Sequence, residues 1–302
     1  MTFVIETKDE GKLLRTFLRE HGVSAALTTK LKQREDGLLL DGQRVTVRAV
    51  LHAGNVLSLG IEEEEPPLHV LPRNLPIEVL LRSADFAVLN KPSNMPTHPS
   101  HGHFEDTLAN ALVYHFSTDQ VPFRPRFINR LDRNTTGAVL VAMHPIAAAA
   151  LSRAMANGEI EKTYLALVHG EVSEARSICT GIRRREESII FREVCAPNEG
   201  DLAETLLTPL ATNGEISFVH LAPRTGRTHQ LRVHMAHIGH PLLGDDLYGK
   251  ADGFPRHALH AATLRFPFDG EEICVRAPLP SDMRDVIEKM GEGVLALATK
   301  EN

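Results

Sequence analysis

The chain of 302 residues contains no tryptophan, three tyrosines and three cysteines. Cys179, Cys195 and Cys274 are widely spaced and form no CxxC pair, which indicates free thiols in a reducing compartment. No apolar run approaches the roughly 18 residues of a membrane-spanning helix. Residues 1–14 lack the basic and apolar pattern of a signal peptide. We therefore expect a cytoplasmic protein with no membrane segment.

Several catalytic signatures are also absent. The sequence has no GxGxxG, Walker or GxSxG motif, so dinucleotide-binding, NTPase and serine-hydrolase functions are not indicated. A zinc site on a helix typically uses two histidines at positions i and i+4. No such pair occurs among the histidines between residues 222 and 249, which are His229, His234, His237 and His240. We expect no metal, and a histidine metalloenzyme remains an alternative that metal analysis would test.

Acidic residues exceed basic ones, 39 to 33, and the resulting net charge of −6 is unusual for a protein that binds nucleic acid. The charge is unevenly distributed, however. Residues 11–60 hold eight Lys and Arg against four Asp and Glu, and residues 220–240 contain three arginines and no acid. Local basic stripes on an acidic body are compatible with RNA binding.

The sharpest change in composition divides the chain in two. Residues 61–76, IEEEEPPLHVLPRNLP, join four glutamates to four prolines, a composition that predicts a linker rather than regular structure. We therefore expect a small N-terminal domain at 1–61, a linker at 62–76 and a larger domain at 77–302. Both domains have ordinary sizes.

The N-terminal unit is predicted to contain two helices and a hairpin. Apolar residues within 13–18 recur at helical spacing, and Gly22 can end that helix. A second helix, about 24–35, begins with Ser24 as its cap and carries three basic residues: Lys30, Lys32 and Arg34. The Asp-Gly pair at 41–42 lies between two apolar runs and indicates a tight hairpin.

The larger unit mixes both kinds of element. The pattern predicts two strands within 77–92, a helix at about 106–116, a buried strand at 137–142, a helix from Pro145 to just before Gly158, and a strand at 162–170. The spacing is not that of regular βαβ units. It therefore favours an α+β fold with a mixed sheet.

An aspartate stands at the entrance of the predicted buried strand. In NRLDRNTTGAVLVA, residues 129–142, Asp132 lies between Arg130 and Arg133. One interpretation is a turn, because Asp, Asn and Gly favour turns and an aspartate flanked by arginines is often only an ion pair. The other is a nucleophile or base that neighbouring guanidinium groups keep ionised.

Two further stretches carry candidate functional residues. Arg224 and Arg227 precede a predicted helix that has Thr228 as its cap, a place suited to binding an anion, although a solvated arginine loop is the alternative. Tyr164 lies near the start of the strand at 162–170. It is either a half-buried strand residue or a platform on which a base stacks.

Taken together, these motifs resemble the RluA-like family of RNA pseudouridine synthases. Residues 129–137, NRLDRNTTG, are similar to the family motif HRLDRxTSG, with Asn129 in place of histidine. Residues 162–164 match Lys-x-Tyr, residues 226–234 match GRTHQIRxH, and NKPSNMPTHPS at 90–100 is similar to NKPxGxxxHP. The motifs follow the family order, and the resemblance covers most of the chain.

The resemblance implies an α+β catalytic domain with a mixed, largely antiparallel sheet flanked by helices, and no metal or cofactor. It implies that Asp132 is the nucleophile, paired with Arg232. Tyr164 would stack on the uracil and is a candidate for assisting removal of the carbon-5 proton. Arg130 would take the space of the extruded nucleotide. Further RNA-binding residues would be Arg133, Arg227, His229 and Lys162.

The N-terminal unit resembles the αL RNA-binding domain of ribosomal protein S four, so Lys30, Lys32 and Arg34 would contact RNA. Ala25 stands where an arginine commonly follows the serine. This domain favours ribosomal RNA over transfer RNA as the substrate, and we expect a monomer. A catalytically inactive RNA-binding protein of the same fold is the main alternative. The presence of Asp132, Tyr164 and Arg232 favours the enzyme.

Overall fold

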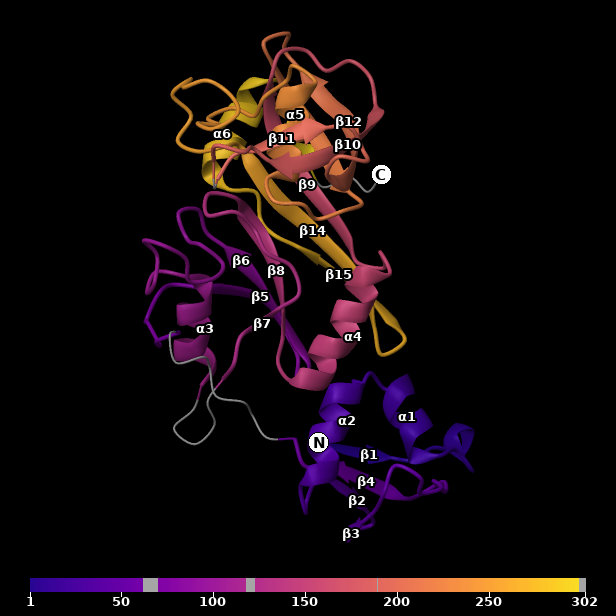
Figure 1. Ribbon diagram of the computed structural model, residues 1–302. Helices are drawn as coiled ribbons and strands as arrows, with labels where there is room; N and C mark the ends of the chain where they lie inside the picture. Colours follow the sequence, from indigo (N-terminus) through magenta and orange to yellow (C-terminus); the bar gives the residue numbers. More distant parts are fainter. Residues whose placement is uncertain (62–69, 118–122, 189, 299–302) are drawn as a thin grey trace.

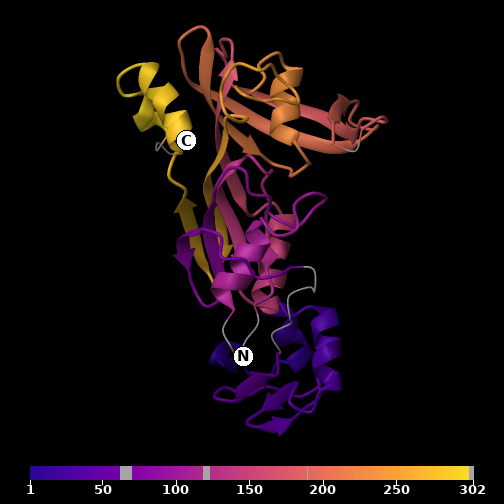
Figure 2. The same ribbon diagram turned by 90° about the vertical axis from the view of Figure 1, so that its left-hand side faces the viewer.

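The computed structural model describes residues 1–61, 70–117, 123–188 and 190–298 (Figure 1). A four-stranded sheet belongs to the N-terminal unit, and an eleven-stranded sheet belongs to the rest of the chain. Of the expected linker, residues 62–69 lie outside the described residues, and 70–76 contain no helix or strand. Figures 1 and 2 show the N-terminal unit at one end of the molecule.

The N-terminal unit has the predicted pair of helices and a hairpin. Ser24 caps the second helix by accepting a hydrogen bond from the Leu27 amide at 3.1 Å. Asp41 (φ 50°) and Gly42 (φ 78°) form the hairpin turn, which needs positive φ at both positions. The elements are β1 (Thr2–Val4), η1 (Thr7–Asp9), α1 (Leu14–Glu20), α2 (Ala25–Gln33), β2 (Leu38–Leu40), β3 (Gln43–Arg44) and β4 (Val56–Leu59).

This unit packs against a helix of the larger one, α4 (Pro145–Ala156). Ile146 of α4 belongs to the same buried apolar cluster as Leu14, Phe17 and Leu18 of α1. At Gly22, a Cβ atom would lie only 3.3 Å from the Cβ of Ala150. The glycine that ends α1 therefore also allows the unit to lie close to α4, as Figure 1 shows.

The large sheet is mixed and mostly antiparallel, as expected. Its order is β11-β10-β12-β13-β9-β14-β8-β6-β5, with β15 beside β14 and β7 beside β8, and the β14–β8 pair is parallel. Its strands are β5 (Glu78–Arg82), β6 (Phe86–Lys91), β7 (Arg126–Phe127), β8 (Thr136–Ala142), β9 (Glu161–His169), β10 (Arg176–Arg184), β11 (Arg192–Cys195), β12 (Asp201–Thr212), β13 (Ile216–Pro223), β14 (Leu259–Phe268) and β15 (Glu271–Arg276).

Helices cover both faces of the sheet around β8. Val139 and Val141 pack in one cluster with residues of α3 (Leu108–Phe116), whereas Leu140 packs in another with residues of α4. Every residue of β8 is buried, which explains its continuous apolar run. The remaining helices are α5 (Gln230–His237), α6 (Ser281–Lys289) and α7 (Val294–Leu297). The predicted strands and helices of this unit are confirmed.

Two further predictions concern the cysteines and the lack of a membrane-spanning helix. Cys179, Cys195 and Cys274 are all free, as predicted. Within the described ranges, no helix is both long enough and apolar enough to cross a bilayer.

Gly137 allows β8 to approach β14. It has a φ of 110° and lies opposite Ala261 in the parallel pair. A Cβ atom at this position would collide with the Ala261 carbonyl oxygen. The glycine of the NTTG stretch is therefore required by both the backbone conformation and the strand spacing.

We expect Gly137→Ala to lower the free energy of unfolding by more than about 4 kcal/mol, because a main-chain clash in the core adds to the positive-φ strain. The matched control is Gly214→Ala: Gly214 has a φ of 89°, but a Cβ there would meet no atom within 4 Å. Strain alone should cost about 1–3 kcal/mol. Equal losses for the two variants in urea unfolding would contradict the close approach of β8 and β14.

Candidate active site

Asp132 lies in the loop between β7 and β8, at the wall of a cleft of about 1050 Å³. The cleft is also lined by six of the other residues predicted from the sequence: Arg130, Lys162, Tyr164, Arg227, His229 and Arg232. They come from the β7–β8 loop, from β9, from the loop after β13 and from α5, so segments distant in sequence meet here. The side chain of Asp132 is 29% exposed.

Buried side chains hold the backbone on both sides of Asp132. The Thr97 hydroxyl donates to the Leu131 carbonyl at 2.9 Å and accepts from the Leu131 amide at 3.3 Å. The Lys91 ammonium donates to the Arg133 carbonyl at 3.0 Å and to two carbonyls of its own loop at 2.8 Å. Burial lowers the pKa of Lys91 to about 7, and the charge of Asp132 opposes this shift. Movement of the loop would therefore leave buried hydrogen-bond donors without partners, which costs free energy.

The next three residues are held in the same way. Arg256 donates to the Asn134 carbonyl at 3.3 Å. The hydroxyls of Thr135 and Thr136 share hydrogen bonds with His257 and His260, at 2.8 and 2.9 Å. Burial lowers the pKa of His257 to about 3 and that of His260 to about 4, so both imidazoles are neutral near pH 7. Thr136, which replaces the serine of the motif, uses its hydroxyl in this contact.

Asn129, the departure from the family motif, also has a definite role. Its side-chain amide donates to the Ala138 carbonyl at 3.1 Å, and its oxygen accepts from the Leu140 amide at 2.7 Å. The amide therefore binds the backbone of β8 as a neighbouring strand would. Asn129 therefore supports the start of β8, and it also lines the cleft.

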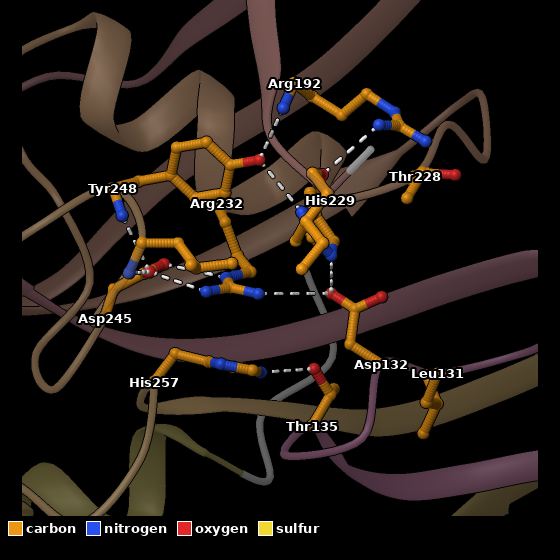
Figure 3. Close-up of polar contacts among 12 residues, drawn as sticks. Leu131, Asp132, Thr135, Arg192, Thr228, His229, Arg232, Asp245, Tyr248 and His257 are labelled. Atoms are coloured by element: carbon orange, nitrogen blue, oxygen red, sulfur yellow. Dashed lines mark hydrogen bonds and ion pairs between the residues drawn. The ribbon is translucent and has the colours of Figure 1, made fainter. Parts of the chain in front are cut away.

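Arg232 of α5 makes its closest contacts with a residue that the sequence analysis did not single out. Its Nε and Nη2 donate to Asp245 at 2.8 and 2.7 Å, and both side chains are buried. The remaining Nη1 lies 3.9 Å from Asp132 Oδ2 (Figure 3). Arg232 is thus anchored by Asp245 and faces Asp132 at ion-pair distance. Asp245 belongs to GHPLLGDDLYG, residues 239–249, which closely follow the motif at 226–234. Its position beside that motif is the sequence feature that could have identified it.

The charges of this group influence one another. Burial opposes the charged form of Arg232, but its hydrogen bond to Asp245 and the charges of Asp245 and Asp132 raise the pKa of the guanidinium above its ordinary value. Burial likewise opposes ionisation of Asp245, but the bonds from Arg232 lower its pKa. The pair is therefore charged across the neutral range.

The expectation that Thr228 caps α5 is wrong. His229 is the residue before the helix, in a left-handed backbone conformation (φ 57°), and Thr228 instead accepts a hydrogen bond from Arg130 at 3.4 Å. The loop is closed by Gln230, whose side-chain oxygen accepts from the Thr225 hydroxyl and the Arg227 amide at 2.8 and 3.0 Å. This arrangement directs His229 toward the cleft.

Tyr164 forms part of the floor of the cleft. It is 9% exposed and belongs to the main apolar cluster, together with Leu131, Leu231 and Leu259, which also line the cleft. Burial, and secondly the negative charge of Asp132, raise the pKa of the Tyr164 phenol well above its ordinary value. Its side chain is therefore a neutral phenol at physiological pH.

The lining is strongly basic. Six cationic side chains contribute to it: Arg130, Lys162, Arg192, Arg224, Arg227 and Arg232. Asp132 is the only carboxylate among the described residues that line the cleft. Such a surface suits a polyanion, in spite of the net charge of −6 for the whole chain.

Four residues predicted to bind RNA are not among those lining the cleft. Arg133 is exposed and shares a hydrogen bond with His103 at 3.0 Å. Lys30, Lys32 and Arg34 belong to α2 or follow it in the N-terminal unit, where Arg34 also binds Asp36. In the part of the chain that the structure describes, no group of three or more His, Cys, Asp or Glu side chains could hold a metal ion.

Comparison with known proteins identifies the class. The sequence model of the RNA pseudouridylate synthase family matches residues 85–237, a span that contains Asp132, Tyr164 and Arg232. The chain belongs to this family of isomerases, and the prediction of an RluA-like pseudouridine synthase is confirmed.

Individual relatives match most of the chain. It is 36% identical to the uncharacterized RNA pseudouridine synthase YjbO of Bacillus subtilis (strain 168), over 91% of this chain and 98% of that protein. It is 34% identical to ribosomal large subunit pseudouridine synthase D of Zymomonas mobilis, over 72% of this chain and 74% of that protein. The structure of human RNA pseudouridylate synthase domain containing 1 has a TM-score of 0.56 at 29% identity, covering 79% of this chain and 99% of that one.

We expect Asp245→Ala to lower the free energy of unfolding by about 3–5 kcal/mol, because it leaves the buried Arg232 without its counter-ion. Asp246→Ala is the matched control: Asp246 lies 3.5 Å from the same Nη2 but is 78% exposed, so its loss should cost less than about 1 kcal/mol. Urea unfolding of both variants measures the difference. A loss at Asp246 as large as that at Asp245 would refute the assignment of Asp245 as the anchor.

Proposed function

We propose that this isomerase converts uridine to pseudouridine in ribosomal RNA, with Asp132 as its nucleophile. The observation that carries the proposal is the position of Asp132 as the only carboxylate among the described lining residues of a basic cleft. Two side chains at ion-pair distance, Arg232 at 3.9 Å and His229 at 4.0 Å, can orient it.

The reaction breaks the bond between ribose and the uracil nitrogen, turns the base and joins ribose to carbon 5. Carbon 5 loses its proton, and the released nitrogen gains one. A carboxylate can form and then release a covalent bond, which divides one difficult step into easier ones. The tightly held loop from Leu131 to Thr136 supports this role, because a nucleophile acts best in one geometry.

The neighbouring residues would position the nucleotide. Tyr164 would pack against the uracil from the apolar floor, and its raised pKa makes a phenolate base unfavourable. Arg130 is exposed at the cleft and reaches Thr228 across it, a place from which it could fill the space left by an extruded base. Arg227 and Lys162 would bind the phosphates or edges of the flanking RNA.

The choice of ribosomal RNA rests on two observations. Several relatives are named ribosomal large subunit pseudouridine synthase D, including those of Zymomonas mobilis and Haemophilus ducreyi. The N-terminal unit presents exposed Lys30 and Lys32 on α2, which supports an RNA-binding domain at residues 1–61 beside a catalytic domain at 77–302. A monomeric state and a cytoplasmic location stay predictions.

A test of the nucleophile is release of the carbon-5 hydrogen from labelled uridine in RNA. We expect Asp132→Ala and the isosteric Asp132→Asn to lower the rate by at least about 10⁴-fold, because neither can form the covalent bond. Asp246→Asn, which changes an exposed carboxylate near the same arginine, should keep the wild-type rate. Label release by Asp132→Ala at the normal rate would refute the proposal.

The substrate class is tested by mapping pseudouridines in a strain that lacks this protein. We expect one or more sites in ribosomal RNA to become unmodified, and to be restored by the wild-type gene but not by Asp132→Asn. Loss of sites in transfer RNA alone would contradict the ribosomal assignment. An unchanged map, with RNA binding retained by the purified protein, would favour an inactive RNA-binding protein of the same fold.

A further inference from the structure

A chain of polar contacts leads from β11 to Asp132 through His229 and through Tyr248, which has no part in the steps above. The Arg192 backbone amide donates to the Tyr248 hydroxyl at 2.9 Å. The same hydroxyl lies 2.9 Å from His229 Nδ1, and His229 Nε2 lies 4.0 Å from Asp132 Oδ2. Figure 3 shows His229 between the hydroxyl and the carboxylate.

The directions of these contacts favour one tautomer of His229. The Arg192 amide can only donate, so Tyr248 accepts there and its own hydrogen is available for His229 Nδ1. The hydrogen of the neutral imidazole then lies on Nε2 and faces Asp132. The opposite tautomer would place a lone pair on Nε2 against the carboxylate, which is repulsive.

The charges around His229 favour its neutral form. Burial is the largest influence and lowers its pKa, and the cations Arg232 and Arg192 act in the same direction. Asp132 and Asp245 oppose them, and Tyr248 and His257 are further titratable groups near the ring. A neutral imidazole with hydrogen on Nε2 can donate to Asp132, and it has no free lone pair with which to remove a proton.

The backbone conformation that directs the His229 ring toward Asp132 is unusual, and Tyr248, the partner of the ring, is held in place by its own contacts. His229 has φ 57° and ψ 15°, a left-handed backbone conformation that costs energy for a residue other than glycine. Tyr248 is itself fixed: its amide donates to Asp245 Oδ1 at 3.0 Å, and the Arg232 guanidinium lies 5.2 Å from the centre of its ring. The anchor of Arg232 therefore also places Tyr248.

Both contacts to the carboxylate reach the same atom. Arg232 Nη1 and His229 Nε2 lie 3.9 and 4.0 Å from the same atom, Asp132 Oδ2, and both dashed contacts in Figure 3 end on this oxygen. We propose that Tyr248 and His229 are positioning residues, which present an Nε2–H donor to Oδ2 of Asp132 and leave Oδ1 as the reacting oxygen. This inference rests on the proposed nucleophilic role of Asp132.

The tautomer can be observed without any activity. Two-bond proton–nitrogen spectra of histidine-labelled full-length protein should show His229 as the neutral Nε2–H form at pH 7, with His229→Gln used to assign the signal. In Tyr248→Phe the signal should change toward a mixture of tautomers, whereas Tyr114→Phe, at an exposed tyrosine, should leave it unchanged. An Nδ1–H form or a charged imidazolium in the wild type overturns the proposal.

Kinetics test the consequence for the reaction. We expect His229→Ala and Tyr248→Phe to lower kcat by on the order of 10- to 100-fold, with KM within about twofold, because orientation and not RNA binding is lost. His229→Gln should recover part of kcat, since its amide can donate to Oδ2. His237→Gln, on the exposed side of α5, should behave as the wild type.

The outcomes separate the two proposals. Wild-type kcat in His229→Ala, or a His229→Gln variant no better than the alanine, overturns the positioning role even if Asp132 proves essential. Thermal melting of each variant checks that kcat is compared between folded proteins. Absence of pseudouridine formation by the wild type would refute the proposed function, while the spectra would still test the tautomer.

Discussion

The buried ion pair between Arg232 and Asp245 is the interaction on which the cleft depends. Two charges removed from water are stable only when each satisfies the other, and here two parallel hydrogen bonds of 2.7 and 2.8 Å do so. The pair joins α5 to the turn after it. It aims the third nitrogen of Arg232 at Asp132 and places Tyr248 behind His229. Removing one partner therefore disturbs three positions together.

The Asp132 loop is held by a different means, with backbone carbonyls and hydroxyls as the main partners. Lys91 and Arg256 are both buried and donate to carbonyls of the loop, and neutral histidines bind its two threonines. Lys91 also interacts with the charge of Asp132, without a direct bond to it. Gly137 then lets the strand behind the loop lie against β14.

Many of the helices, strands and turns could be predicted from the sequence, because local patterns determine local structure. The apolar run at 137–142, the Pro145 and Gly158 limits of α4 and the Asp41–Gly42 hairpin each follow from backbone and burial preferences. The exception was Thr228, a suitable cap by residue type that lies one position too early. Gln230 closes that loop with contacts to Thr225 and Arg227. The preferences of residue types for the cap position take no account of such side-chain contacts, so they did not predict this loop.

The amino-acid sequence is sufficient to assign the class of protein, because its motifs follow the family order and contain Asp132, Tyr164 and Arg232. The side chains that these residues contact are visible only in the folded chain. Asp245 anchors Arg232, Asn129 binds the backbone of β8, and His229 lies between Tyr248 and Asp132. The physical reason is that such contacts depend on distance and direction between segments brought together by the sheet, and spacing along one segment carries neither.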